Sequence, residues 1–303
     1  MAAQTKLNPL QKLRDSGQSP WMDSLRRGWI TSGELEKMIR EDGISGITVN
    51  PTVYERAISD SSDYDDAIRE LVRHGTGIPQ IYEALLVEDI RAAADLLRSA
   101  YDAADGADGF VSVNLPPSLA FDTIGSIREA HRLQSLIDRS NIMFNIPATP
   151  QGLPAIEELT YDGVNVNATF LFFIDVYEKA ARAYIRALER RAEDDEPLNR
   201  AASMASFFVS RLDVEVDTQL EEMISRTGDS DQRLKLDLLL GKAAIANAKL
   251  AYKRFMDIFS EDRFKDLESQ GARVQRLIWA STGTKSPRYP REYYVENLIG
   301  PNT

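Results

Sequence analysis

The 303-residue sequence predicts a single α/β domain in which strands and helices alternate to form a closed (β/α)8 TIM barrel. Eight short runs of β-branched or other apolar residues recur along the chain, and segments of helical periodicity separate them. Strands that are apolar on both faces are typical of a parallel sheet covered by helices. No GxGxxG pattern follows any of these runs, which weakens the alternative of an open dinucleotide-binding sheet.

The predicted strands are spaced as βα units require. They lie at residues 19–25, 46–50, 109–115, 141–147, 163–172, 203–212, 276–282 and 293–299. Apolar residues keep helical spacing in three of the intervening segments, within 86–101, 177–188 and 244–258. The longer helical section 213–271 is expected to hold extra helices between strands six and seven, as an elaborated crossover or a small insertion, and not a separate domain. The whole chain, residues 1–303, is therefore expected to be one barrel domain with a short N-terminal extension.

Composition excludes several classes of protein. No apolar run reaches the roughly 18 residues of a membrane span, and the N-terminus lacks the apolar segment of a secretory signal. The chain has no cysteine, so no disulfide framework is indicated and a cytoplasmic location is expected. The net charge is −11 with Lys and Arg scattered along the helices, so nucleic acid is not an expected partner.

Polar residues near the carboxyl ends of the predicted strands are the candidates for a site, because active sites of such barrels gather there. A helix cap or a loop contact accounts for any one of them taken alone. Since they fall on seven of the eight predicted strands, together they indicate a polar pocket that binds a small molecule. The candidates are Asp23, Asn50, Asn114, Asn145, Asn165, Asn167, Thr169, Ser206, Arg211 and Lys285.

Six motifs resemble the transaldolase family, in the family's order and over nearly the whole chain. The resemblance implies a class I aldolase-like barrel that makes and breaks ketose phosphates through a Schiff base, without a metal or another cofactor. The motifs are SPWMDSL, GITVNPTVYERAI, IPATPQGLPAIEEL, GVNVNATFLF, ASFFVSRLD and GKAAIANAKLAY.

The resemblance assigns roles to four of the candidate residues in the reaction itself. Asp23 matches a proton carrier on the first strand, and Asn50 matches an amide that hydrogen-bonds substrate hydroxyls. Asn167 and Thr169 match a polar pair on the fifth strand, in which Thr169 holds the catalytic water. These roles are what the family pattern implies for this chain.

The resemblance also implies a binding site for the substrate's phosphate. Ser206 and Arg211 match the phosphate-binding residues of the family, and the STGTK segment that ends at Lys285 resembles the basic turn that completes them. The expected partner is accordingly a small molecule that can carry a phosphate.

Two positions depart from the family pattern. The family's Schiff-base lysine precedes IPAT, where this chain has Asn145, and its proton-shuttling glutamate ends the third strand, where this chain has Asn114. No lysine occurs between Lys37 and Lys179, so strands two to five offer no amine. An amide neither forms an imine nor exchanges protons near neutral pH. Because neighbouring parallel strands lie about 4.8 Å apart, the two amides are expected to hydrogen-bond to each other.

These departures lead to an expected function and two alternatives. We expect an enzyme that keeps the family's pocket but performs another reaction (condensation, cyclisation, dehydration or enolisation) with Asp23 as acid and base, and that lacks transaldolase activity. Asn50, Asn114, Asn145 and Thr169 are then the hydrogen-bonding residues. The alternatives are a non-catalytic binding protein and a transaldolase carrying inactivating substitutions.

The end of the sequence is a further point of comparison with the family. The chain stops at IGPNT, directly after the eighth predicted strand, whereas family members of this type usually continue with a helical segment. Without that cover, the pocket mouth is expected to admit larger substrates and to exclude water less well.

Overall fold

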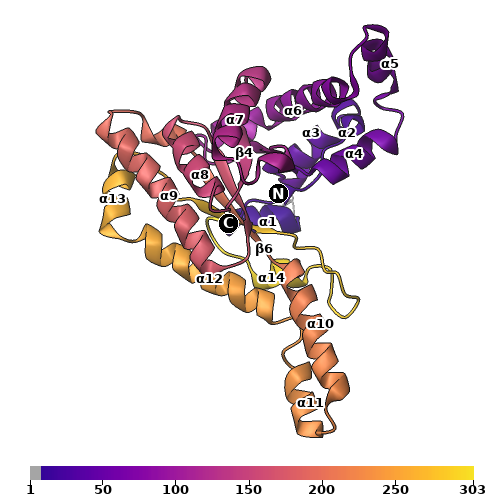
Figure 1. The fold of residues 1–303 in the computed structure, drawn as a ribbon, viewed down its shortest axis with the longest axis vertical. Helices are drawn as coiled ribbons and strands as arrows, with labels where there is room; N and C mark the ends of the chain where they lie inside the picture. The colour runs from indigo at the N-terminus through magenta and orange to yellow at the C-terminus, as the bar shows by residue number, and fades with distance from the viewer. Residues whose placement is uncertain (1–7) are drawn as a thin grey trace, which may run out of the picture.

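Seven parallel strands in sequential order, β1 to β7, curl into an incomplete barrel with helices on its outside (Figure 1). The computed structural model describes residues 8–303, so residues 1–7 of the predicted N-terminal extension lie outside the described part. The α/β barrel fold is confirmed. The strands are β1 (Trp21–Met22), β2 (Gly46–Val49), β3 (Phe110–Asn114), β4 (Ile142–Pro147), β5 (Val166–Leu171), β6 (Ser203–Phe208) and β7 (Arg276–Ala280).

Alternation along each strand separates the helix-facing core from the barrel interior. On β4, Ile142, Phe144 and Ile146 are fully buried in the main core with apolar residues of the surrounding helices. Met143, between them, belongs to a separate cluster with Phe110 and with Met204 of β6. The second cluster therefore lies on the interior side of the strands, and Asn145 follows Met143 on the same side of β4.

The helices cover the outside of the barrel, and those predicted from periodicity are found as α6, α9 and α12. The extra helices predicted between strands six and seven are also confirmed, and α10 and α11 project from the barrel (Figure 1). The helices are α1 (Pro9–Asp15), α2 (Arg27–Thr31), α3 (Glu34–Lys37), α4 (Pro51–Ser59), α5 (Asp65–Arg73), α6 (Ile78–Ala103), α7 (Thr123–Ile137), α8 (Gly152–Tyr161), α9 (Ile174–Glu193), α10 (Ser210–Arg226), α11 (Ser230–Asp237), α12 (Ala243–Phe259), α13 (Asp262–Ser269) and α14 (Tyr293–Asn297). Shorter helical turns lie at Met38–Asp42, Pro117–Leu119 and Leu198–Arg200.

The eighth predicted strand, 293–299, is wrong: its residues form helix α14 and an irregular segment after it. Tyr294 and Leu298 are both buried, and they pack with Ala244 and Ala248 of α12. Residues four apart point to the same side of a helix and also to the same side of a strand, so this spacing alone does not decide between the two. Packing on α12 thus overrides the strand preference of the aromatic and β-branched residues in this segment.

A segment at 300–303 that contains a turn lies beside β7, where the eighth strand was expected. The amide of Leu277 on β7 donates to the carbonyl of Asn302 at 3.2 Å, and the amide of Asn302 donates to the carbonyl of Gly17 at 3.0 Å. The amide of Ser19 donates to the carbonyl of Thr303 at 2.8 Å. This segment therefore bridges β7 and the residues before β1, and it narrows the gap in the barrel wall.

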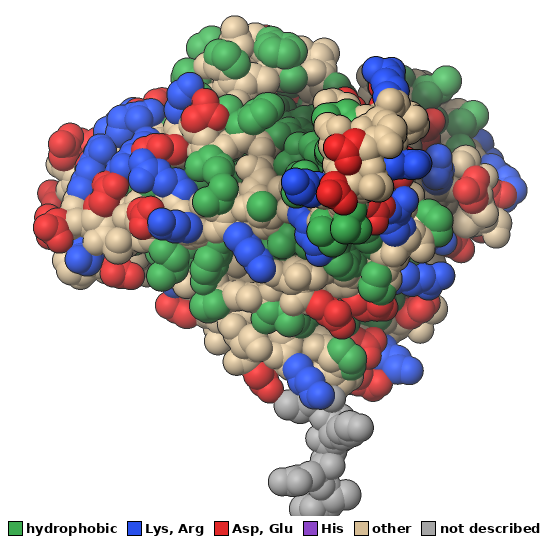
Figure 2. All heavy atoms as spheres, turned by 90° about the horizontal axis from the view of Figure 1, so that it is seen from below, with side chains coloured by type: hydrophobic (Ala, Val, Ile, Leu, Met, Phe, Trp, Pro, Cys, Tyr) green, Lys and Arg blue, Asp and Glu red, His purple; other side chains and the backbone are tan. Residues whose placement is uncertain are grey.

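The surface carries charges of both signs. Figure 2 shows acidic and basic side chains interspersed over the face seen from below. Among residues 8–303, no helix is both long and apolar enough to cross a membrane.

Candidate active site

A cavity of about 1080 Å³ opens at the carboxyl ends of the strands, and every strand contributes to its lining. The predicted site residues converge on it from separate elements of the chain, which is the arrangement expected for a barrel of this class. Their convergence supports a common site, while the role of each residue stays a prediction. The predicted residues that line the cavity are Asp23, Asn50, Asn114, Asn145, Asn167, Thr169, Ser206, Arg211 and Lys285.

Hydrogen-bonded side chains form what we call the amide belt (Ser112, Asn114, Asn145, Asn167 and Ser206) across the barrel interior. Asn145 Nδ2 donates to Asn114 Oδ1 at 2.8 Å, so the expected bond between these two residues is present. Asn167 Nδ2 donates to Asn145 Oδ1 at 2.8 Å, and Ser112 Oγ also donates to that oxygen. Ser206 Oγ donates to Asn167 Oδ1 at 2.9 Å. The belt thus joins four neighbouring strands.

Strand register explains why these amides meet. Asn145 is the in-register partner of Asn114 on β3 and of Asn167 on β5. Asn145 is 5% and Asn167 2% exposed, so their polar atoms need partners within the protein. Two residues earlier on β4 and β6, the interior side chains are Met143 and Met204 of the second cluster. The belt lies between these methionines and the carboxyl ends of the strands, and Met204 itself also lines the cavity.

Ser112 is a belt member that the sequence analysis missed. It lies two residues before Asn114 on β3 and is fully buried. A period of two places both residues on the same side of a strand, and this signal was available in the sequence. A serine in the middle of a buried strand, VSVN, is polar enough to have been included.

Asp23 lies just after β1 and is exposed to the cavity. Its carboxylate has no hydrogen-bond or ion-pair partner in the part of the chain that the structure describes. The guanidinium of Arg26, one alternative partner, lies over the ring of Trp29 at 5.2 Å instead. Asp23 is therefore available to a bound molecule.

Asn50 and Thr169 differ in how many hydrogen bonds their side chains make within the protein. Asn50 caps α4, because its Oδ1 accepts from the amide of Thr52 at 3.1 Å. Its Nδ2 makes no hydrogen bond to another residue within 8–303. Thr169 is 8% exposed, and its hydroxyl likewise has no hydrogen-bond partner among the described residues. Each thus has a polar group free for a ligand or a water molecule.

Asn165 was predicted to lie at the site, and the structure corrects this. It precedes β5, at the amino end of the strand, and does not line the cavity. Its Nδ2 donates to the carbonyls of Ser140 and Ile142 at 3.0 and 2.9 Å, and its Oδ1 accepts from the amide of Ala202 at 3.1 Å. These bonds hold together the loops that enter three neighbouring strands, which is a structural role.

Two cations without partners face the cavity. Arg211 lies in the first turn of α10 with its guanidinium 5.4 Å from the ring centroid of Phe208, and Lys285 lies in the loop after β7. Both side chains are exposed, and neither forms an ion pair or hydrogen bond with any residue in 8–303. Of the described residues, Lys285 is also the only lysine that lines the cavity. The arrangement fits an anionic ligand group.

An aromatic rim of Phe170 and Phe208 borders the cavity, and it was not predicted from the sequence. Phe170 has a left-handed backbone with φ of 62°, which is rare for an aromatic residue, and the pairing of β5 with β6 shifts register between Ala168 and Leu171. This bulge breaks the alternation, so Thr169 and Phe170 both line the cavity. Phe170 lies 5.7 Å from Phe208, centroid to centroid.

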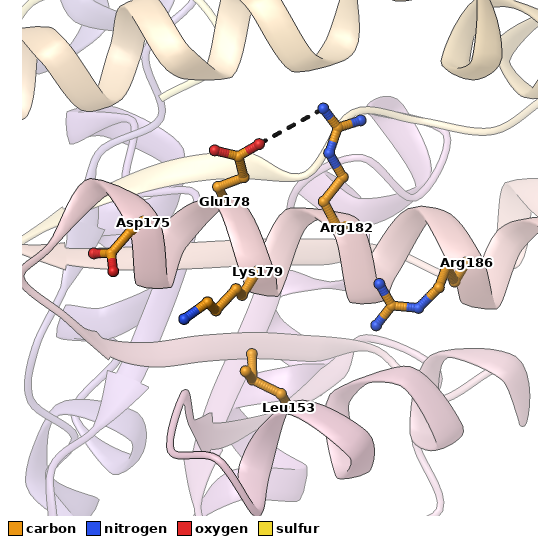
Figure 3. Close-up of a pocket in the computed structure, with 6 residues that line it drawn as sticks. All are labelled: Leu153, Asp175, Glu178, Lys179, Arg182 and Arg186. Atoms are coloured by element: carbon orange, nitrogen blue, oxygen red, sulfur yellow. Dashed lines mark ion pairs between the residues drawn. The ribbon is translucent and has the colours of Figure 1, made fainter.

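A second, smaller pocket of about 450 Å³ lies on the outside of the barrel, over α8 and α9 (Figure 3). Its charged side chains largely pair with one another or with neighbours. Glu178 and Arg182 point to one side of α9 and lie 3.7 Å apart, and Arg182 also pairs with Glu261 at 2.6 Å. Arg186 pairs with Glu157 at 2.7 Å. This pocket is therefore a surface ion-pair network, and the strand-end cavity is the better candidate for a site.

Comparison with known proteins adds a family to this geometry. The family model for transaldolase/fructose-6-phosphate aldolase matches residues 20–303. The chain is 45% identical to a transaldolase of Trichodesmium erythraeum over 296 residues, which is 98% of this chain and 78% of the relative. It is 46% identical to transaldolase 2 of Nostoc punctiforme over 98% of this chain and 78% of the relative. It is 43% identical to a transaldolase of Saccharopolyspora erythraea over 97% and 77%, respectively.

These relatives correct the function expected from the sequence. We expected an enzyme that had diverged from transaldolase to another reaction, and this expectation is wrong. Relatives that are 43–46% identical over nearly the whole chain bear the name transaldolase, and they support an enzyme of that kind. They agree better with the alternative in which the chain is a transaldolase, stated above as one carrying inactivating substitutions.

Proposed function

The chain belongs to the transaldolase/fructose-6-phosphate aldolase family, whose substrates are small phosphorylated sugars, and from this premise we propose that it is a transaldolase acting on a ketose phosphate. One observation carries the assignment of the site. The cavity combines the polar amide belt with two unpartnered cations, Arg211 and Lys285. A sugar phosphate needs both, because its hydroxyl and carbonyl groups require hydrogen bonds and its phosphate requires positive charge.

The proposed reaction moves a three-carbon dihydroxyacetone unit from sedoheptulose 7-phosphate to glyceraldehyde 3-phosphate. The C3–C4 bond of the donor breaks as the hydroxyl on C4 gives its proton to a base. The electron pair of that bond stays on the three-carbon fragment, delocalised toward its C2 carbonyl. The fragment then attacks the aldehyde carbon of the acceptor, and the proton returns to the new hydroxyl. Asp23 is the base and acid in both steps, because it is the unpartnered carboxylate of the site.

Binding of the phosphate is assigned to the two cations. Arg211 lies at the start of α10, and its stacking on Phe208 limits where its guanidinium can reach. Lys285 approaches from the loop that follows β7. Hydrogen bonds to a charged phosphate contribute more than neutral ones, so these two residues are expected to supply much of the affinity.

We assign the binding of the substrate's C2 carbonyl oxygen to the side-chain amides of Asn114 and Asn145. Each Nδ2 carries two N–H groups, and the protein uses one of them, in the bonds from Asn114 to the carbonyl of Val49 at 2.9 Å and from Asn145 to Asn114 at 2.8 Å. The second N–H of each amide can donate to the carbonyl oxygen as negative charge develops on it. One such donor is typically worth about 10²–10³ in rate. An amide forms no imine, so this assignment is non-covalent.

The test measures product formation from sedoheptulose 7-phosphate and glyceraldehyde 3-phosphate by mass spectrometry, and binding of fructose 6-phosphate by calorimetry. Arg211→Ala is expected to weaken fructose 6-phosphate binding by roughly 10- to 100-fold. Arg226→Ala, at the far end of α10 and 78% exposed, is the matched control and is expected to bind like the wild type. If the wild type forms no product, the proposed reaction is wrong, and if it binds no sugar phosphate, the assignment of the site is wrong as well.

Treatment with borohydride in the presence of fructose 6-phosphate tests the non-covalent assignment. We expect the mass of the protein to stay unchanged. A reduced adduct at Lys285 would show that this lysine forms an imine, and would replace the role given to Asn114 and Asn145.

A further inference from the structure

We propose that Tyr289 and Asp217 form a latch that positions Lys285 relative to Arg211. These two side chains, which lie outside the cavity, would then set the geometry of the two cations that bind the phosphate. Neither Tyr289 nor Asp217 lines the cavity. The inference rests on the proposed function, because it concerns how that site holds a phosphate. Tyr289 and Asp217 are positioning residues, since they would act through the two cations.

The latch joins the two elements that carry the cations. Tyr289 Oη donates to Asp217 Oδ2 at 2.7 Å. Asp217 lies on α10, six residues after Arg211, and Tyr289 lies four residues after Lys285 in the loop that follows β7. The other oxygen of Asp217 accepts from the amide of Gly241 at 2.9 Å. The carboxylate is therefore held in place from a third segment and offers Tyr289 a fixed acceptor.

A second attachment closes the other end of the loop. The amide of Ser210, the first residue of α10, donates to the carbonyl of Ser281 at 3.2 Å. Ser281 and Tyr289 thus both bond to α10, and Lys285 lies midway between them. The side chain of Lys285 itself has no hydrogen-bond or ion-pair partner in the described chain. Its reach toward the cavity then depends on the two ends of the loop, of which only Tyr289 is held by a side chain.

Packing around Tyr289 supports one docked position. A Cβ built on Gly241 would lie 2.6 Å from the tyrosine ring, so only glycine leaves room for the ring there. The ring of Tyr289 also stacks on that of Tyr293, with 5.0 Å between centroids. Burial, together with the hydrogen bond to Asp217, raises the pKa of Tyr289, so its hydroxyl keeps the proton that it donates at neutral pH.

Exposed ion pairs make a smaller contribution to the same attachment. Arg288 lies 3.2 Å from Asp237 of α11 and 3.5 Å from Glu221 of α10. All three side chains are about half exposed, and pairs of this kind typically contribute little. The hydroxyl of Tyr289 is thus the group to remove.

Tyr289→Phe removes the hydroxyl and keeps the ring, and binding of fructose 6-phosphate is measured by calorimetry on the full chain. We expect the dissociation constant to rise roughly 3- to 10-fold, as for the loss of one hydrogen bond, with no change for unphosphorylated fructose. Tyr161→Phe is the matched control, because Tyr161 Oη donates to Asp194 Oδ2 at 2.6 Å in a similar pair away from the cavity. Asp217→Asn is expected to restore most of the affinity that Asp217→Ala loses, since the asparagine amide can donate to the tyrosine hydroxyl.

Coupling to Lys285 separates positioning from a general loss of structure. In the background of Lys285→Ala, Tyr289→Phe is expected to cost no further affinity, because the latch would then have no cation to position. If Tyr289→Phe lowered the affinity for fructose 6-phosphate equally with and without Lys285, the inference would be overturned. Wild-type affinity in Tyr289→Phe would overturn it as well.

Hydrogen exchange of the backbone amides of 282–288 provides a measurement that needs no ligand. Exchange is expected to be faster in Tyr289→Phe than in the wild type, and unchanged in Tyr161→Phe. Unchanged exchange in Tyr289→Phe would show that no latch exists. If the wild type binds no sugar phosphate, the proposed function fails by itself, and exchange still decides whether Tyr289 holds the loop.

Discussion

Asn145 on β4 donates a side-chain hydrogen bond of 2.8 Å to Asn114 on β3, its in-register neighbour. The two amides occupy the positions at which the family resemblance implies a lysine and a glutamate. Replacing one member of a buried ion pair leaves an uncompensated charge, whereas replacing both with neutral partners avoids that cost. The interior of the barrel therefore carries a neutral, hydrogen-bonded belt at this level.

Removal of the central amide is expected to destabilise the protein. Asn145→Ala leaves Asn114 Oδ1 and Asn167 Nδ2 without their partner in a largely buried place, at a cost of about 1–3 kcal/mol in the free energy of unfolding by urea. The control is Asn297→Ala, which removes an exposed amide that bonds only to the carbonyl of Tyr293 in its own helix. We expect the control to stay within about 0.5 kcal/mol of the wild type. Equal stability of the two variants would contradict the structural role of the belt.

Restoring the implied family pair is expected to create an imine-forming site. Asn145→Lys together with Asn114→Glu places an amine and a proton shuttle on adjacent strands. Borohydride reduction with fructose 6-phosphate should then leave a reduced secondary-amine adduct of the sugar, or of its three-carbon fragment, at position 145, as peptide mapping would show. Asn145→Lys alone is expected to be trapped much less, because a well-placed acid or base contributes roughly 10²–10⁴ in rate. Equal trapping in both variants would rule out a need for the carboxylate.

Asp23→Asn is expected to abolish turnover while leaving the affinity for fructose 6-phosphate nearly unchanged. The reason is that Asp23 is assigned the proton transfer, and the phosphate is assigned to other residues. Rates come from the product assay and affinities from calorimetry. Asp66→Asn, at a fully exposed carboxylate on α5, serves as the control. Wild-type turnover in Asp23→Asn would move the proton transfer to another group.

The raised pKa of Tyr64 predicts that part of the stability of the protein is lost at alkaline pH. Burial and the neighbouring carboxylate of Asp89 raise the pKa of Tyr64 to about 12. The unfolded chain loses this proton near about pH 10, so the contribution of the neutral tyrosine to stability is complete below pH 10 and is lost as the pH rises toward 12. Tyr64→Phe lacks this proton. The stability difference between wild type and variant should therefore shrink from pH 9 to pH 12.

Urea unfolding at both pH values measures this difference. Tyr64→Phe is expected to be less stable than the wild type at pH 9, because Tyr64 Oη donates to Asp89 at 2.9 Å and accepts from the amide of Arg27 at 3.0 Å. Groups that contact neither Tyr64 nor Asp89 are the same in both proteins and cancel in the comparison. A difference that stays constant with pH would show that Tyr64 titrates alike in the folded and unfolded chains.

The periodic pattern predicted most of the fold, and it was wrong where a short segment fits two periods. Tyr294 and Leu298 are four residues apart, which a helix places on one side, yet the aromatic and β-branched neighbours also suggest a strand. Asn165 shows the same ambiguity along a strand. It shares a face with Asn167 and Thr169, and only the true start of β5 places it at the amino end, away from the cavity.

The sequence by itself determined the alternation of strands and helices, which depends on the local period of apolar and polar residues, and the nine predicted residues that line the cavity, which stand near the carboxyl ends of the predicted strands. The tertiary structure alone decided which of those residues touch. The bond from Asn145 to Asn114 depends on strand register, and the bond from Tyr289 to Asp217 joins segments 72 residues apart. The physical reason is that hydrogen bonds act over about 3 Å, a scale set by packing between elements and not by spacing along the chain.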